Sequence, residues 1–128
     1  RRSAHLGKKI LIVEDERLLV KTLADALSDQ GYTTAVAGDA GQAEQLLFPE
    51  SSFDLVVLDN RLPDRSGVEV LRRIREEGLS VRVIVMTAYG TNGLEAELKK
   101  LRVDGFVKKP FDLNRFLEAI ADVVGAKS

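Results

Sequence analysis

Short aliphatic runs alternate with helix-like segments along the whole chain, and this alternation is the strongest constraint on its fold. The segments between the runs carry apolar residues at the spacing of one helix face. The predicted strands are 8–13, 32–37, 53–58, 81–86 and 105–108. The predicted helices are 16–30, 39–48, 67–77, a segment marked by Leu94, Leu98 and Leu101, and a last one striped with apolar residues from Leu113 to Val124.

Five strands that alternate with five helices predict an α/β fold with a parallel sheet. Parallel strands need crossover connections, which helices supply, and the right-handedness of these crossovers leaves helices on both faces of the sheet. The 128 residues fit one domain with a single core. We expect one domain over 1–128, with its core at about 8–125 and frayed ends at 1–7 and 126–128.

Composition argues against several classes of function. The net charge is −1 and the acidic and basic residues are interspersed, so no charged patch points to nucleic acid or to an anionic membrane. The absence of cysteine rules out disulfides and cysteine metal sites, and it fits a reducing cytosol. No apolar run exceeds four residues, so no membrane span is expected. We therefore expect a cytoplasmic domain without direct nucleic-acid or membrane binding.

Polar side chains follow the predicted strands where ligands bind in open α/β sheets, which is outside the carboxyl ends of the strands. They are Glu14 and Asp15 after the first strand, Asp59 after the third, Thr87 after the fourth, and Lys109 and Pro110 at the fifth. Residues from distant parts of the chain would thus converge on one crevice.

The predicted crevice is acidic. Its three carboxylates and one ammonium group leave a charge of about −2, and carboxylates packed this closely raise one another's pKa or recruit a cation. A few oxygen ligands suit Mg²⁺, which keeps several of its waters. The acidic segment VEDER at 13–17 repels a free phosphate. With a divalent ion present, a phosphoryl group could enter between the metal, Lys109 and a hydroxyl group.

Four motifs in chain order resemble the receiver domain of two-component response regulators. They are VEDE at 13–16, VVLDNRLPDRSG at 56–67, MTAYG at 86–90 and FVKKPF at 106–111. The resemblance covers about residues 8–125 and extends to stand-alone phosphorelay receivers and to the receivers of enhancer-binding regulators. It implies a bacterial signalling protein with a doubly wound, flavodoxin-like three-layer sandwich and the strand order 2-1-3-4-5.

The resemblance also implies a phosphoacceptor and a metal site. Asp59 would attack a phosphohistidine of a partner protein. Asp15 and Asp59 would bind Mg²⁺ directly, Glu14 would bind it through water, and the backbone carbonyl of Arg61 would be a further ligand.

Other residues would contact the phosphoryl group and report its presence. Thr87 and the N–H of Ala88 would hydrogen-bond to its oxygens, and Lys109 would pair with it as a positive charge. Pro110 would follow a cis peptide bond, which is a minority state for residues before proline in general. Phe106 would change rotamer together with Thr87.

The implied function is a phospho-switched receiver. A sensor histidine kinase or a histidine phosphotransfer protein would supply the phosphoryl group, and the face of the fourth helix, fifth strand and fifth helix would respond. An effector domain or a downstream target would read that face, and the domain would be a monomer or would dimerise on phosphorylation. It would not be an enzyme beyond self-phosphorylation from small donors and self-dephosphorylation.

Two other functions compete with this one. A Mg²⁺-dependent phosphatase with an aspartyl nucleophile usually has a second Asp two positions after the first, where Arg61 stands here. A receiver-like scaffold that is never phosphorylated would not need the complete set of site residues.

Structural roles also stay open for single residues. Asp59 could cap a turn, Thr87 could be an ordinary strand residue, and Phe106 could fill the core. Ser66 and Asp112 are candidate helix caps.

One departure from the family pattern lies at the end of the fourth helix. Arg102 and Val103 stand where a Gly-Ala pair often ends this helix. Because a bulky residue resists the left-handed conformation of a glycine cap, we expect this end to be built differently.

Overall fold

The computed structural model describes residues 7–88 and 93–125, in which five strands and five helices alternate. The fraying expected at 1–7 and 126–128 therefore falls outside the described residues, except for Gly7. The elements are β1 (Lys9–Val13), α1 (Arg17–Asp29), β2 (Thr33–Ala37), α2 (Ala40–Leu47), β3 (Leu55–Asp59), α3 (Gly67–Glu76), β4 (Arg82–Ala88), α4 (Leu94–Lys100), β5 (Gly105–Lys109) and α5 (Leu113–Val124). Within the described ranges, no helix has the length and apolar character needed to cross a membrane.

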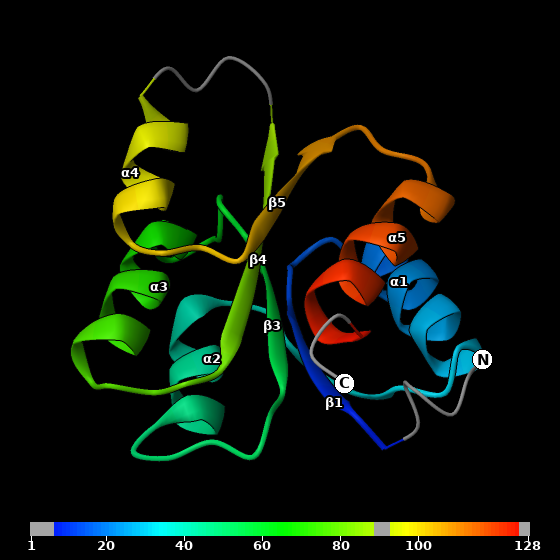
Figure 1. The fold of residues 1–128 in the computed structure, drawn as a ribbon, viewed down its shortest axis with the longest axis horizontal. Helices are drawn as coiled ribbons and strands as arrows, with labels where there is room; N and C mark the ends of the chain where they lie inside the picture. The colour runs from blue at the N-terminus through cyan, green and yellow to red at the C-terminus, as the bar shows by residue number, and fades with distance from the viewer. Residues whose placement is uncertain (1–6, 89–92, 126–128) are drawn as a thin grey trace.

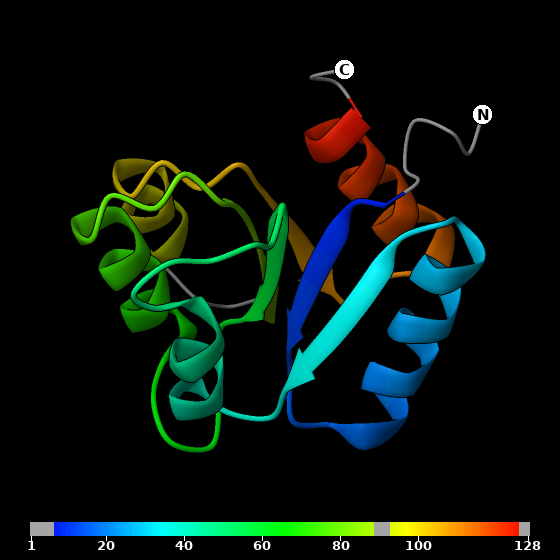
Figure 2. The same ribbon diagram turned by 90° about the horizontal axis from the view of Figure 1, so that it is seen from below.

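The strands form one parallel sheet in the order β2-β1-β3-β4-β5. Figure 1 and Figure 2 show α1 and α5 together on one face of the sheet and α2, α3 and α4 on the other. This doubly wound, flavodoxin-like sandwich confirms the predicted fold class and strand order. It brings the carboxyl ends of all five strands to a single edge.

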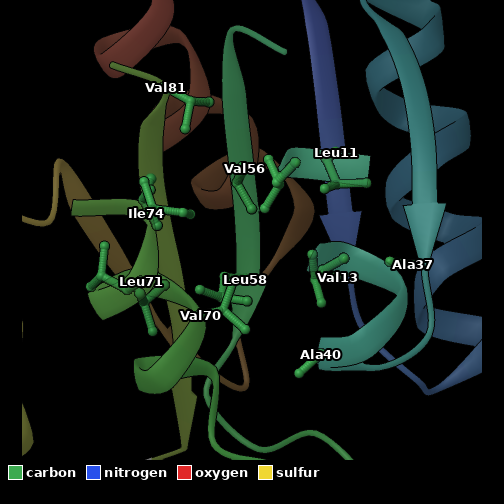
Figure 3. Packing of buried hydrophobic residues seen from close by; sticks show 14 of the residues in the cluster. Leu11, Val13, Ala37, Ala40, Val56, Leu58, Val70, Leu71, Ile74 and Val81 are labelled. Carbon is green, nitrogen blue, oxygen red and sulfur yellow. The ribbon is translucent and has the colours of Figure 1, made fainter. Parts of the chain in front are cut away.

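Successive residues of the inner strands fill two separate layers of the core. Leu11 and Val56 face the side of α2 and α3 (Figure 3), whereas Ile10 and Val57 belong to the cluster under α1 and α5. All residues of β3 are buried. Strands covered on both faces are apolar almost throughout, which explains why their sequences do not alternate with polar residues. The polar residues at the ends of these strands are thus held on a rigid backbone.

Three strands extend further than the sequence predicts, and the third of them, β5, ends at Lys109 instead of residue 108. Asp59 is the last residue of β3 and pairs in register with Met86, while Ala88 ends β4 opposite Lys109. For β3 and β4, the sequence predicts an end where the apolar run stops. The backbone ladder does not depend on the side chains, so it continues through the first polar residues and fixes them in the sheet.

The end of α4 contradicts the expectation from the sequence. Arg102 adopts the left-handed conformation with φ of 57°. Its N–H donates to the carbonyl oxygen of Lys99 (3.0 Å), and the N–H of Val103 donates to that of Leu98 (3.1 Å). These are the two hydrogen bonds of a glycine-type cap. The prediction of a differently built ending is therefore wrong.

Arg75 of α3 explains how a bulky residue is held in this turn. Its guanidinium group donates to the carbonyl oxygens of Leu101 (3.0 Å) and Arg102 (2.8 Å), and it pairs with Asp104 at 3.2 Å. A left-handed residue other than glycine costs roughly 1–2 kcal/mol. Hydrogen bonds from a charged donor can offset a cost of this size.

Candidate functional site

Three carboxylates meet at the carboxyl edge of the sheet. Glu14 follows β1 and is held there by its backbone N–H, which donates to the carbonyl oxygen of Ala37 (3.0 Å). Asp59 ends β3, and both of these side chains are buried, whereas Asp15 is exposed. One carboxylate oxygen from each of the three acids lies within 4.8 Å of the others. The structure thus brings together the three acidic residues that the sequence places at strand exits.

Lys109 reaches this acidic cluster from the last residue of β5. Its Nζ lies 3.0 Å from Glu14 Oε1 and 3.2 Å from Asp59 Oδ1. Glu14 uses its other oxygen to accept the backbone N–H of Glu16 (3.0 Å). One ammonium group at the end of β5 therefore links the acid that follows β1 to the acid that ends β3, and it holds these two buried side chains in fixed positions.

The electrostatics of the cluster are unbalanced. Burial, followed by the charge of Glu14, raises the pKa of Asp59 from 3.8 to about 6, although Lys109 and the backbone N–H of Arg61 act in the opposite direction. Burial lowers the pKa of the Lys109 ammonium group, but its hydrogen bond to Glu14 and the charge of Asp59 outweigh burial and raise that pKa overall. Three carboxylates against one ammonium leave about two negative charges, which a divalent cation would neutralise. The donor set therefore fits a hard dication.

Thr87 and Phe106 lie on the same face of the sheet. Thr87 is buried in β4 and follows Val83 and Val85 at a spacing of two residues, so it points to the side of α3 and α4. Phe106 is opposite Val85 in the neighbouring strand and is half-buried against the same cluster. The two residues predicted to switch together are thus on adjacent strands.

The remaining predicted residues line the rim of the site. Ala88 is exposed at the end of β4, and the Lys109–Pro110 peptide bond is cis, as the resemblance implies. The motif at 86–90 continues into residues that lie outside the described ranges. Lys108, beside Lys109, is exposed and pairs with Glu95 at 3.5 Å.

The β3–α3 loop (residues 60–66) folds back on itself beside Asp59. The N–H of Asn60 donates to the carbonyl oxygen of Met86 (2.9 Å), and the N–H of Gly67 donates to that of Asn60 (2.8 Å). Arg61 and Ser66 form an antiparallel bridge. Ser66 also caps α3 by accepting the N–H of Val68 (3.1 Å), and Asp112 caps α5, which confirms both predicted caps.

Several residues near the site escaped sequence reasoning. Asp64 accepts the N–H groups of Ala40 (2.9 Å) and Gly41 (3.0 Å) at the start of α2, and Arg65 forms two hydrogen bonds to Glu44 (2.9 and 2.6 Å). These partners lie more than twenty positions apart in the chain. A turn-forming Asp and a charged loop residue give no local signal of such contacts.

Comparisons with known proteins agree on one family. The model of the response regulator receiver domain matches residues 10–121. Sporulation initiation phosphotransferase F of Bacillus subtilis is 34% identical over 123 residues, which are 96% of this chain and 98% of that protein. The transcriptional regulatory protein DltR of Streptococcus agalactiae is 35% identical over 117 residues, 88% of this chain but only 50% of that protein. The non-phosphorylated HemR receiver domain from Leptospira biflexa superposes with a TM-score of 0.85 at 33% identity, covering 91% of this chain and 94% of that one.

Proposed function

The chain belongs to the response regulator receiver domain family, and on this premise we propose that Asp59 accepts a phosphoryl group from a phosphohistidine in the presence of Mg²⁺. The family consists of phosphoryl acceptors in two-component and phosphorelay signalling rather than of enzymes in the usual sense. It implies a histidine kinase or a phosphotransferase as partner. We place this reaction in the cytoplasm, where the kinase would deliver the phosphoryl group.

The observation that carries the proposal is the position of Lys109 between two buried acids. Its ammonium group contacts Glu14 and Asp59 at 3.0 and 3.2 Å, with Asp15 close by. A structural ion pair would need one acid, not three. An arrangement that keeps surplus negative charge around a buried Asp is costly for the fold, and such costs are typical of functional sites.

Asp59 is the nucleophile of the proposed reaction. One of its carboxylate oxygens attacks the phosphorus, the bond between phosphorus and the histidine nitrogen breaks, and its electron pair stays on the imidazole. The carboxylate needs no general base, because it is already ionised when the pH is above its pKa of about 6. The remaining task is to position the reactants and to neutralise the phosphoryl oxygens.

The neighbours of Asp59 supply these effects. The Lys109 ammonium group would move from the acids to the phosphoryl oxygens, and the Thr87 hydroxyl and the Ala88 N–H would donate to them. Glu14, Asp15, Asp59 and the Arg61 carbonyl would hold Mg²⁺. When bound, the ion supplies positive charge that offsets both the carboxylates and the phosphoryl group.

We expect a small phosphodonor such as acetyl phosphate to add one phosphoryl group per chain, located on Asp59, and only with Mg²⁺ present. Without the cation a phosphate dianion must approach three carboxylates. The measurement is intact-mass spectrometry followed by peptide mapping of the acyl phosphate, with and without a chelator. Uptake that maps to another residue, or that survives chelation, would contradict the proposed function.

The phosphorylated state would be read out through the α4–β5–α5 face. We propose that the Thr87 hydroxyl and the Phe106 ring couple the site to this face, which would contact an effector domain or a downstream target, or would mediate dimerisation. The chain spans nearly the full length of the phosphotransferase relative and half of DltR. A stand-alone relay and a receiver within a longer regulator are both compatible with these lengths.

Thr87→Ala is expected to leave phosphoryl uptake in place but to weaken the response of the output face. Phosphorylation adds roughly −1.5 to −2 charges, and a hydrogen bond to a charged group contributes about 1.5–3 kcal/mol. Losing it would shift the switching equilibrium about tenfold to a hundredfold toward the inactive form. Phosphorylation-dependent amide shifts in α4, β5 and α5 report this equilibrium by NMR. Thr87→Ser, which keeps the hydroxyl, should respond like the wild type; an unchanged response in Thr87→Ala would remove Thr87 from the coupling route.

A further inference from the structure

We propose that Asp64 and Arg65 are positioning residues: by fastening the tip of the β3–α3 loop to α2, they fix the Arg61 carbonyl for the cation. This inference rests on the proposed function, because it concerns the same metal site. Among the described residues, these two side chains form hydrogen bonds to α2 and not to the acidic cluster or Lys109, and the inference assigns them a task.

The loop is a narrow turn whose base holds Arg61 and whose tip holds Asp64. The bridge between Arg61 and Ser66 closes the base, and the N–H of Leu62 donates to the carbonyl oxygen of Arg65 (3.2 Å) across the turn. Arg61 therefore cannot move independently of the tip. Whatever fixes the tip also fixes the direction of the Arg61 carbonyl.

Asp64 fastens the tip of the β3–α3 loop to the first turn of α2. Its two oxygens accept the N–H groups of Ala40 (2.9 Å) and Gly41 (3.0 Å). These hydrogen bonds, with that to Ala40 the strongest contribution, lower the pKa of the Asp64 carboxyl group. The helix does not need Asp64 for its own cap, because Asp39 already accepts the N–H of Gln42 (2.7 Å). The main effect of the Asp64 contacts is therefore to hold the β3–α3 loop, on which Asp64 lies, against α2.

Arg65 fastens the other side of the tip to the middle of α2. Two of its guanidinium nitrogens donate to the two oxygens of Glu44, at 2.9 and 2.6 Å. The Glu44 side chain is only 15% exposed, and Arg73 of α3 approaches it at 3.6 Å. A two-pronged contact to a mostly buried carboxylate fixes orientation as well as distance. Two independent anchors thus hold one loop against one helix.

Loss of these anchors should weaken the metal site without removing a ligand. Groups that orient metal ligands typically change metal affinity by 10–100-fold when they are mutated. For a backbone carbonyl on an otherwise intact loop, we expect Asp64→Ala and Arg65→Gln each to raise the Mg²⁺ dissociation constant about tenfold. Amide exchange over residues 60–67 should become faster in both variants even without Mg²⁺.

The chain offers a matched control for each variant. Asp39→Ala also removes an acidic contact at the start of α2, and Arg73→Gln also removes a positive charge beside Glu44, but neither residue lies on the loop. Mg²⁺ titration by calorimetry and hydrogen exchange are run on the wild type and all four variants. The controls should lose comparable thermal stability, bind Mg²⁺ within about twofold of wild type, and keep slow exchange in the loop.

The outcomes separate the inference from its premise. If the wild type binds Mg²⁺ and takes up phosphate but the loop variants bind no more weakly than their controls, the positioning role is overturned and the proposed function stands. If the wild type binds no Mg²⁺, the proposed function fails and the positioning role fails with it. Weaker binding in the loop variants alone supports the inference.

Discussion

Asp59→Asn is expected to abolish phosphoryl uptake and, at the same time, to make the metal-free domain more stable at neutral pH. The first effect is complete because the amide oxygen is a far weaker nucleophile than the carboxylate and no acyl phosphate can form on Asn. The second follows from burial: Asp59 is 6% exposed, lies beside Glu14, and its pKa rises from 3.8 to about 6 on folding. An amide has the same shape without the charge.

The direction of the pH dependence follows from these two values. The folded state holds the Asp59 proton up to a pKa of about 6, whereas the unfolded chain releases it near 3.8. Stability therefore falls as the pH rises from 3.8 to 6, and the loss is complete above 6. It amounts to about 3 kcal/mol, at 1.36 kcal/mol for each pH unit between the two values. The Asn variant lacks this loss, so its advantage is largest near neutrality and shrinks on acidification.

Urea unfolding at about pH 7 and about pH 4.5, with and without Mg²⁺, measures the effect. The free energy of unfolding of Asp59→Asn should exceed that of the wild type at the higher pH, and Mg²⁺ should narrow the gap by stabilising only the wild type. Asp15→Asn, which removes an exposed acid from the same crevice, should change metal-free stability much less. Asp25→Asn on α1 serves as the control for uptake. A less stable Asp59→Asn protein at neutral pH would mean that Lys109 compensates the buried charge fully.

Much of this site could be predicted from the sequence because its residues lie at the ends of strands, and strand ends can be recognised in the sequence. The runs that end before Glu14 and Asp59 predict strands, and parallel topology then brings the two acids to one edge. No side-chain contact had to be known to reach this result. For Lys109, the sequence predicts only that its side chain lies in the same crevice as the acids. Its contacts with Glu14 and Asp59 at 3.0 and 3.2 Å depend on how far each strand extends, which the sequence does not show.

Contacts between loops and helices were not predictable in the same way. Asp64 is a turn residue in the sequence, and nothing local connects it with the N–H of Ala40. The left-handed Arg102 is a second case, because intrinsic preference argues against it and Arg75, twenty-seven positions earlier, supplies the compensation. In both places a long-range hydrogen bond decides the local structure. Sequence patterns that extend over one or two turns of helix cannot contain that information.

Gly67→Ala is expected to destabilise the domain and to impair the phosphorylation site, although alanine is the better helix former. Gly67 is the first residue of α3, where Ala in place of Gly would by itself favour the helix by up to about 1 kcal/mol. However, a Cβ at this position would lie 2.2 Å from the backbone oxygen of Asp59 and 3.2 Å from the Leu58 side chain. The first contact is far inside the van der Waals limit and involves backbone, so either α3 or the end of β3 must move.

Overpacking of this kind typically costs 1–3 kcal/mol, and contact with backbone places it at the upper end, about 3 kcal/mol. The clash therefore outweighs helix propensity. Because the atom displaced belongs to Asp59 itself, phosphoryl uptake should slow along with the loss of stability. Urea unfolding and the rate of uptake from acetyl phosphate measure the two effects. Gly38→Ala is the matched control at the same edge of the sheet, since its Cβ would meet only the Gln42 side chain at 3.7 Å. If Gly67→Ala unfolds at the same urea concentration as Gly38→Ala and is phosphorylated as fast as the wild type, then the start of α3 can shift away from β3 without disturbing Asp59.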